Sequence, residues 1–484
     1  MALISTEVIL LAGGLTLALV GAVKELRPRA FAWSAAAICV VAGVNASAGW
    51  WWLPFEPGQL PSWVTASIAA DAFAIFFAIF ASLAGLVVCL SAGEYLERRE
   101  IAHAGEFFGL LLLALFAVCL LAAAADLVTL YLGIEFLGIS AYALAGFAKR
   151  DPRSSEAGIK YFLVGAVSSA IMLYGMSLLY GITRATSLTA IGEYLLGVGG
   201  DPTAMGAAML VLVGLGFKVA LVPFHMWCPD AYEGAPTPIT AFLSVAPKAG
   251  GFAALVRVFL LALPGLAWGP ILAALAGLTM TVGNLLAIPQ SNIKRMLAYS
   301  SIAQAGYIII GLSVAPLSSF GVPGVLFYLM AYLFMNLGAF AAVVAVSNST
   351  GSDEVSDYAG LMRRSPFLAS ALVIFFLSLA GIPPLAGFLG KLLVFGAAIE
   401  AHYYTLAVVG VLNSVVSIYY YFNVVRMMFM RPAGGGEPIV VERALYLAVV
   451  LALVGTFALG LFPHAVIGLA QAAARSVAAR APLL

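Results

Sequence analysis

Apolar segments of about twenty residues, the length a helix needs to cross the hydrocarbon core of a membrane, recur along almost the whole chain. Only 9% of the 484 residues are charged, against roughly a quarter in an average soluble protein. Helices are the expected spanning elements, because backbone polar groups in lipid must bond within the structure. Fourteen segments qualify, at roughly 5–23, 31–48, 69–91, 106–125, 127–147, 159–181, 204–222, 239–262, 270–288, 296–313, 324–346, 367–391, 403–428 and 444–462.

Lysine and arginine are distributed unevenly between the two sets of alternate connections. Fifteen lie in one set: Lys24, Arg27, Arg29, Arg98, Arg99, Lys149, Arg150, Arg153, Lys160, Lys294, Arg295, Arg363, Arg364, Arg431 and Arg443. Three lie in the other set and the C-terminal tail: Arg184, Arg475 and Arg480. Because cytoplasmic loops carry the positive excess, the first set is predicted to be cytoplasmic. With fourteen spans, both termini are then expected on the outer side of the membrane.

Proline interrupts two of the spans, where it removes a backbone donor and clashes with the preceding turn. The seventh span meets Pro223, and the twelfth contains Pro383 and Pro384 in the sequence GIPPLAG. Each break falls in the fourth span of a five-span block, and an odd number of spans reverses the direction of the next block. We therefore expect an all-α polytopic membrane protein with two inverted five-helix repeats, each containing a broken helix. The predicted divisions are 1–104 (helices 1–3), 105–262 and 263–430 (the two repeats), and 431–484 (helix 14 and tail).

Three lysines and one carboxylate lie well inside predicted spans, where a charged side chain costs about 2.5–3.5 kcal/mol on insertion scales. They are Lys218, Lys248 and Lys391, in the seventh, eighth and twelfth spans, and one carboxylate, Glu135, in LYLGIEFLGIS. Desolvation disfavours the ammonium form, so a buried lysine exchanges protons more readily than an exposed one. The pattern predicts a proton relay in which movement of Glu135 switches Lys218 between holding and releasing a proton.

These polar residues also have structural alternatives. Glu135 and Lys218 would suit a static buried ion pair that fixes helix packing, although such pairs are weak evidence for stability. His225, just after the first break, is expected either to pass protons between lysines or to cap a helix end. Gln304, in the tenth span, can order water but cannot change charge, and it would equally suit a helix–helix hydrogen bond.

Nothing in the sequence indicates a cofactor or metal site in this chain. The four cysteines (Cys39, Cys89, Cys119 and Cys228) lack metal-ligand spacing, and no glycine-rich nucleotide motif is found. The net charge of +1 gives no indication of nucleic-acid binding.

Three stretches resemble a known family. They are FKVALVPFHMWCPDAYEGAPTPITAFLS (217–244), SNIKRMLAYSSIAQAGY (291–307) and LAGIPPLAGFLGK (379–391). They are similar to the antiporter-like subunits of respiratory complex I (NADH–quinone oxidoreductase), most closely to the subunit N family, over roughly residues 65–430. The resemblance implies that Glu135, Lys218, Lys248 and Lys391 match the buried charges of that family. Relatives often carry a histidine where this chain has Gln304.

The resemblance also implies a function: a subunit of a proton-translocating enzyme of the respiratory chain, with no redox centre of its own. Electrons would pass from NADH to quinone in other subunits, where flavin and iron–sulfur clusters are expected as well. The expected partners are a neighbouring antiporter-like subunit, small membrane subunits, lipids and protons. The implied location is a bacterial plasma (inner) membrane, with both termini on the periplasmic side. Three alternatives stay open: a subunit of a multi-subunit sodium/proton antiporter, a subunit of a related membrane-bound hydrogenase or dehydrogenase, and a purely structural membrane anchor that needs none of the buried lysines.

Overall fold

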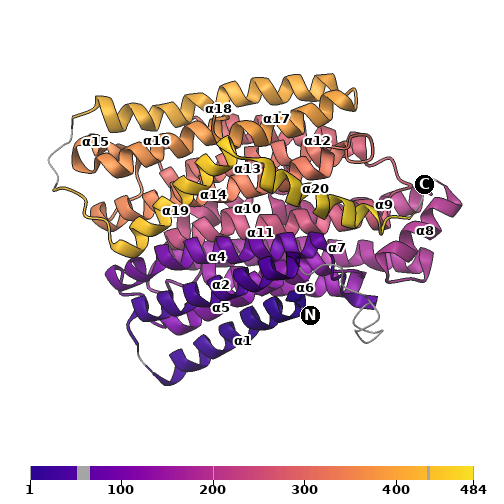
Figure 1. Ribbon diagram of the computed structural model, residues 1–484, viewed down its shortest axis with the longest axis horizontal. Helices are drawn as coiled ribbons and strands as arrows, with labels where there is room; N and C mark the ends of the chain where they lie inside the picture. The colour runs from indigo at the N-terminus through magenta and orange to yellow at the C-terminus, as the bar shows by residue number, and fades with distance from the viewer. Residues whose placement is uncertain (1, 25, 52–65, 200, 433–436, 483–484) are drawn as a thin grey trace.

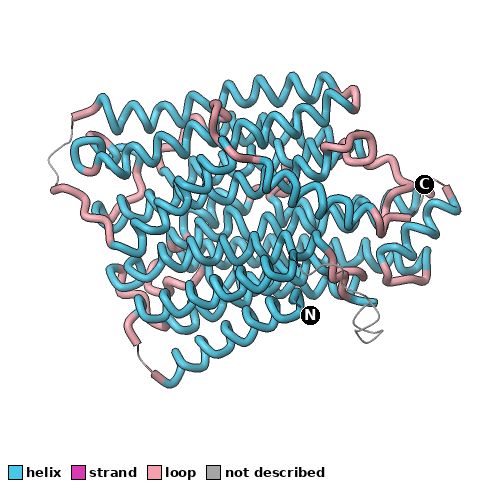
Figure 2. Tube along the Cα trace, in the orientation of Figure 1, coloured by secondary structure: helices cyan, strands magenta, loops and turns pink. Residues whose placement is uncertain are grey.

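The computed structural model describes residues 2–24, 26–51, 66–199, 201–432 and 437–482, which form a bundle of helices (Figure 1). No strand occurs among these residues (Figure 2). The elements are α1 (Ala2–Val23), α2 (Pro28–Trp51), α4 (Ala72–Arg98), α5 (Ala104–Ala123), α6 (Leu127–Ala145), α7 (Pro152–Thr183), α8 (Leu188–Val198), α9 (Pro202–Val219), α10 (Trp227–Gly234), α11 (Thr237–Arg257), the π-helix η2 (Val258–Ala262), α12 (Gly269–Ala287), α13 (Ile293–Ser313), α14 (Gly321–Thr350), the 3₁₀ helix η3 (Val355–Tyr358), α15 (Leu361–Arg364), α16 (Pro366–Ala380), α17 (Ala386–Glu400), α18 (Tyr404–Met430), α19 (Arg443–Leu461) and α20 (His464–Ala478).

Thirteen helices in the described part of the chain are long and apolar enough to cross a membrane. They correspond to thirteen of the fourteen predicted segments. The remaining segment, the twelfth, consists of the two shorter helices α16 and α17, because the break divides it. The prediction of an all-α polytopic membrane protein is confirmed.

The first break separates α9 from α10. Ala220 has a φ of 60°, in the left-handed region, and this conformation ends α9. The chain then passes Pro223 without regular helix before α10 begins. The amide of Val222, within the break, donates to Oγ1 of Thr279 in α12 at 3.1 Å. A backbone group that the break removes from helical bonding therefore finds a partner inside the protein.

The second break separates α16 from α17. Gly381 has a φ of 90°, a conformation that glycine adopts without a Cβ clash, and Pro383 and Pro384 follow it. Gly387 lies so close to the end of α16 that a Cβ there would be 1.9 Å from the carbonyl oxygen of Ser378. The amide of Gly387 also donates to Ser378 Oγ at 3.1 Å. This close approach packs the start of α17 directly against α16.

The element order places both breaks at the same point of a five-span series. The first series is α5, α6, α7, α9–α10 and α11, and the second is α12, α13, α14, α16–α17 and α18. Figure 1 shows the first helices (indigo and violet) on one side of the bundle and α16–α18 (orange) on the other. The division at residues 105, 263 and 431 and the inverted relation of the two series stay predictions.

Helix α11 forms the centre of the bundle, and every residue from Thr237 to Arg257 is buried. It packs against α4, α5 and α9 from the first part of the chain and against α13 and α14 of the second series. Because α11 carries Lys248, this amine lies between the two series and away from the lipid-facing surface.

A buried ion pair joins the end of α11 to the start of α4. The Arg257 guanidinium donates to both carboxylate oxygens of Asp71, at 2.7 and 2.8 Å, and to the carbonyl of Ala122 at 3.0 and 2.8 Å. Asp71 also caps α4 by accepting the amide of Ala74 at 3.0 Å. Arg480, beyond α20, approaches the same carboxylate at 3.2 Å. The C-terminal segment is thus attached to the bundle through Asp71.

We predict that Asp71→Asn destabilises the protein far more than Arg480→Gln. The first change leaves Arg257 buried without a counter-charge, and removing one partner of a buried pair typically costs about 3–5 kcal/mol. The second removes a partly exposed partner, a change typically worth about 0–1 kcal/mol. Thermal unfolding of the detergent-purified variants checks this order. Equal losses for the two variants would show that Arg257 is not the principal partner of Asp71.

Candidate functional site

Lys218 lies in the last turn of α9, immediately before the first break, and is 1% exposed. Its Nζ atom is 5.8 Å from the centroid of the Tyr142 ring in α6. The face of an aromatic ring attracts a cation at such a distance. None of the ion pairs in the described part of the chain includes Lys218. The amine is therefore held in the interior without a fixed counter-charge.

Glu135 lies two turns before Tyr142 on α6 and is half-buried. Its carboxylate accepts a hydrogen bond from the hydroxyl of Ser169 in α7. Glu135 and Lys218, both in the described part of the chain, do not form an ion pair within 4.0 Å. The static pair considered from the sequence is therefore not formed, and the carboxylate is bonded to a neutral hydroxyl instead.

A cluster of aromatic rings fixes the turn that carries Lys218. Trp227, the first residue of α10, stacks on Tyr161 of α7 with ring centroids 4.1 Å apart. The indole nitrogen of Trp227 also donates to the carbonyl of Phe217 at 3.0 Å. Because Phe217 directly precedes Lys218, this bond holds the end of α9 against the start of α10 across the break.

Lys248 lies next to a proline inside α11. Pro247 has no N–H, so the carbonyl of Leu243 lacks its usual helical partner. The hydroxyl of Tyr232, in α10, donates to that carbonyl at 2.9 Å, and the ring of Tyr232 lies 5.9 Å from Lys248 Nζ. Lys248 Nζ donates to the carbonyl and the hydroxyl of Ser301 at 2.8 and 2.6 Å. Its partners are therefore neutral oxygens in α13.

A glycine brings Lys218 close to the helix of Lys248. A Cβ added to Gly251 would lie 3.3 Å from Cβ and Cγ of Lys218 and 2.6 Å from a Val219 methyl group. Gly251 follows Lys248 by three residues, so the two positions are neighbours on the surface of α11. The side chain of Lys218 therefore starts beside the part of α11 that carries Lys248.

Lys391 lies in α17 just beyond the second break and is 4% exposed. Its Nζ atom donates to the carbonyl of Ala380, the last residue of α16, at 2.9 Å. The ring centroid of Tyr307 in α13 lies 4.5 Å from the same atom. Carbonyls at a helix end have no partner within the helix. The second break therefore supplies the acceptor for this lysine.

Helix α13 connects the surroundings of Lys248 to those of Lys391. Ser301 accepts the hydrogen bonds of Lys248, and Tyr307 faces Lys391. Ser300, Gln304 and Tyr307 are separated by four and three residues, which places them on one face of the helix. The structure thus brings Gln304 between the second and third buried lysines.

Gln304 is fully engaged in hydrogen bonds. Its amide nitrogen donates to the carbonyl of Leu379 at 3.0 Å, and its oxygen accepts from Tyr328 at 2.5 Å. A second, longer contact of 3.5 Å joins it to the hydroxyl of Tyr421, which is hydrogen-bonded to Ser300. Since Leu379 directly precedes Ala380, Gln304 and Lys391 bond to adjacent carbonyls at the second break.

His225 lies inside the first break and is 7% exposed. Its Nδ1 atom has no hydrogen-bond partner among the described residues, and the same is true of the Tyr332 hydroxyl and Asn336 Oδ1 in α14. The amide nitrogen of Asn336 donates to Ser244 Oγ at 2.6 Å, one turn before Lys248 in α11. Buried polar atoms are normally bonded to protein or to ordered water. These atoms therefore mark places suited to hold water near Lys248.

Residues 124–417 match the NADH:quinone oxidoreductase/Mrp antiporter transmembrane family, a range that contains Glu135, Lys218, Lys248 and Lys391. NADH-quinone oxidoreductase subunit N of Desulfitobacterium hafniense is 46% identical over 425 residues, which cover 84% of this chain and 85% of that protein. Subunit N of Trichlorobacter lovleyi is 44% identical over 483 residues, covering 98% and 97%.

The chain belongs to the subunit N branch of this family. A chain in the solved structure of respiratory complex I from Thermus thermophilus with bound aureothin is similar as well. It is 35% identical to this chain, with a TM-score of 0.81, and the match covers 96% of this chain and 99% of that one.

Two charged groups of this subunit N chain were missed by sequence reasoning. Glu7 in α1 is 5% exposed. The sequence predicts Glu135 as the only carboxylate well inside a span, and Glu7 is a second one. Arg257 is fully buried at the end of α11. The available signal was their position inside predicted spans, at 5–23 and 239–262.

An ion-pair cluster at one end of the bundle was also missed. Asp230 in α10 accepts hydrogen bonds from Lys160 of α7 at 2.8 Å and from Arg295 of α13 at 2.7 Å. Arg295 also donates to Glu233 at 2.8 Å. The pairs join α7 and α10 of the first five-span series to α13 of the second. Their partners are 62–70 residues apart, so no local pattern indicates the contact.

Metal binding has no support in the part of the chain that the structure describes. No group of three or more His, Cys, Asp or Glu side chains there is placed to hold a metal ion. The four cysteines are buried and not disulfide-bonded.

We predict that the Asp230 cluster loses its stabilising effect only in acid. Partial burial alone raises the pKa of Asp230, but the hydrogen bonds from Lys160 and Arg295 outweigh it and hold the pKa below its usual value of about 3.9. The folded state therefore binds this proton more weakly than the unfolded state. The contribution is complete above the unfolded pKa and disappears as the pH falls through the lower folded value.

Melting temperatures measured from about pH 7 down to about pH 3 check this, because the range passes below the unperturbed carboxyl pKa of about 3.9. Asp230→Asn should lower the melting temperature near neutrality, and its difference from the unchanged protein should shrink in acid. Asp201→Asn, which changes a partly exposed carboxylate outside the cluster and keeps an oxygen to cap α9, is the control. A difference that stays constant with pH would contradict the role given to this carboxylate.

Proposed function

We propose that this chain is a proton-translocating membrane-arm subunit of an NADH–quinone oxidoreductase, driven by redox chemistry in other subunits. The observation that carries the proposal is the series of three buried lysines, each held by neutral partners and placed at or beside a helix interruption. The subunit N relatives, at 44–46% identity, support the same conclusion. The chain would act as part of a translocase and would not itself transfer electrons.

The proposed route runs along the membrane plane. A proton is taken up from the cytoplasmic side near the break at Pro223 and loads Lys218. It then passes to Lys248, with His225 and bound water between them, and continues along α13 to Lys391. The serine and tyrosine hydroxyls of α13, together with the amide of Gln304, support the last stage. Release follows on the outer side from the second series.

Glu135 is the proposed control group. A carboxylate that approaches an amine favours its charged form, and a carboxylate that withdraws favours proton release. In the structure Glu135 is bonded to Ser169 and is not paired with Lys218. It is also half-exposed on α6, so that a charge change in a neighbouring subunit would reach it. This arrangement supports a switch that is set from outside the chain.

Gln304 lies where the family resemblance implies a histidine in many members. An amide donates and accepts hydrogen bonds but does not change charge near neutral pH. It is therefore proposed to hold Tyr328 and the second break in position while water and hydroxyls carry the proton.

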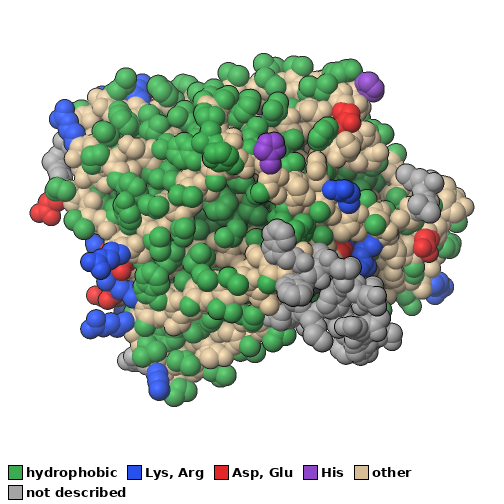
Figure 3. All heavy atoms as spheres, in the orientation of Figure 1, with side chains coloured by type: hydrophobic (Ala, Val, Ile, Leu, Met, Phe, Trp, Pro, Cys, Tyr) green, Lys and Arg blue, Asp and Glu red, His purple; other side chains and the backbone are tan. Residues whose placement is uncertain are grey.

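The proposed orientation places both termini on the periplasmic side of the inner membrane. Figure 3 shows Lys and Arg side chains gathered along the left end of the molecule, where the α1–α2 and α18–α19 connections lie in Figure 1. The start of α1 and the end of α20 lie away from that end (Figure 1). The bias of basic residues toward the cytoplasm supports this orientation.

The partners proposed are the other membrane-arm subunits, including a neighbouring antiporter-like subunit. NADH, flavin, iron–sulfur clusters and quinone would be bound in partner subunits. A sodium/proton antiporter subunit is the second candidate, because the matched family includes Mrp antiporters. Transport by the assembled complex in sodium-free medium separates the two: the proposed function predicts unchanged proton pumping, and a strict sodium requirement favours the antiporter.

We predict that Lys391→Ala abolishes proton transfer through this subunit. Removing a positioned acid–base group typically slows proton transfer by roughly 10²-fold or more. Protons pumped per electron should therefore fall in an assembled complex reconstituted in vesicles. Lys149→Ala, in an exposed connection, is the matched control and should leave the ratio unchanged. Full pumping at normal electron flux in the Lys391 variant would remove this residue from the route.

We predict that Glu135→Gln slows pumping without blocking the path. The amide keeps the size of the carboxylate and its ability to bond with Ser169, but it cannot bias the charge of Lys218. The pumping rate at a fixed electron flux should decrease, whereas passive proton conduction through the purified subunit should persist. A Glu135→Gln complex that pumps at the normal rate would contradict the proposed control role.

A further inference from the structure

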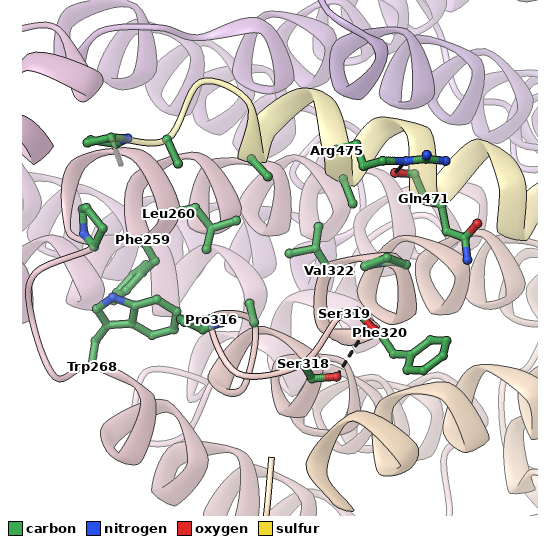
Figure 4. A pocket seen from close by; sticks show the side chains of 17 residues that line it. Phe259, Leu260, Trp268, Pro316, Ser318, Ser319, Phe320, Val322, Gln471 and Arg475 are labelled. Atoms are coloured by element: carbon green, nitrogen blue, oxygen red, sulfur yellow. Dashed lines mark hydrogen bonds between the residues drawn. The ribbon is translucent and has the colours of Figure 1, made fainter. Parts of the chain in front are cut away.

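A cavity of about 640 Å³ lies between α20, η2 and the start of α14. Its size falls within the range of roughly 300–1,000 Å³ that is typical of small-molecule sites. Most of its wall is apolar, with contributions from Phe259, Leu260, Trp268 and Val322. Figure 4 shows Phe259, Leu260 and Trp268 together at one end of the cavity. Nothing in the proposed proton route uses this space.

The opposite end of the cavity is polar. Figure 4 shows Arg475 and Gln471 side by side there, both on α20. The Arg475 Nε atom donates to the carbonyl of Gln471 at 3.3 Å, and no carboxylate in the described part of the chain pairs with it. Arg480, one turn further along, is by contrast paired with Asp71. Arg475 therefore brings an uncompensated positive charge to the mouth of an apolar cavity.

The cavity lies where membrane-spanning helices end. The span that includes η2 ends at Ala262, and the span of α14 begins at Gly321, so both reach the cavity at the same membrane boundary. Lipid headgroups lie at this level, and acyl chains lie directly beside it. A ligand matched to the cavity has a long apolar part and one anionic group.

We propose that this cavity binds one phospholipid. An acyl chain lies against Phe259, Leu260 and Trp268, and the phosphate accepts hydrogen bonds from the Arg475 guanidinium. Arginine pairs with phosphate through parallel N–H donors, which fixes the headgroup as well as attracting it. A free phosphate would use only the polar end and leave the apolar walls uncovered. The inference depends on the membrane placement of these helices and not on the proton route.

Photolabelling in reconstituted vesicles tests the site. The assembled complex is mixed with a phosphatidylglycerol analogue that carries a diazirine at the end of one acyl chain, and labelled peptides are mapped by mass spectrometry. Labelling is expected to concentrate in residues 259–268 and 315–323. Excess unlabelled phosphatidylglycerol should compete, and inorganic phosphate should not.

Variants separate the headgroup from the cavity. Arg475→Gln should lower labelling of these peptides roughly tenfold, as expected for the loss of a charge-assisted hydrogen bond to the phosphate. Arg475→Lys should retain most of it. Arg443→Gln, which removes an exposed arginine at the far end of α19, should leave it unchanged. Leu260→Trp should lower labelling by filling the apolar end while the arginine is intact.

Three results would overturn the proposal. Labelling that is equal in the unchanged protein and the assembled Arg475→Gln variant would show that the phosphate is not held there. Competition by inorganic phosphate would show a simple anion site. Labelling confined to the outward face of α18 would show only the lipid that surrounds any membrane protein.

Discussion

Three buried lysines, Lys218, Lys248 and Lys391, are the main constraint on this fold, because each needs polar partners inside the membrane. A charged amine in hydrocarbon is costly unless it is bonded or hydrated. Here its direct partners are neutral: an aromatic ring for Lys218, a serine for Lys248, and a carbonyl together with an aromatic ring for Lys391. Neutral partners stabilise an ammonium less than a carboxylate does. Such a lysine stays in place in either protonation state, which is what a transfer site requires.

The helix interruptions provide these partners. A continuous helix uses its own carbonyls, but a broken one leaves some of them free for side chains. Lys391 bonds to a carbonyl at the end of α16, and Pro247 leaves the Leu243 carbonyl to Tyr232, whose ring faces Lys248. The interruptions therefore create polar positions in an interior that is otherwise apolar. They also need close packing, which Gly251 and Gly387 provide at the two breaks.

Local chemistry was readable from the sequence, whereas pairing across the bundle was not. The proline positions correctly predicted the two breaks, and the lysine positions the three buried amines, because each of these effects arises within a single helix. The twelfth segment was correctly expected to be broken, and the structure divides it into α16 and α17. The bonds of Lys248 to Ser301 and of Arg257 to Asp71 join residues 53 and 186 positions apart. Such contacts depend on how the helices pack, and no local periodicity carries that information.

The central claim is that the space between the buried lysines conducts protons, and the most direct measurement is a high-resolution cryo-EM map of the assembled complex that shows ordered water. The account predicts water molecules within hydrogen-bonding distance of His225 Nδ1, the Tyr332 hydroxyl and Asn336 Oδ1, forming a chain that reaches Lys248 and continues to Lys391. Dry apolar packing between the two helix breaks, with these polar atoms bonded only to protein, would contradict it.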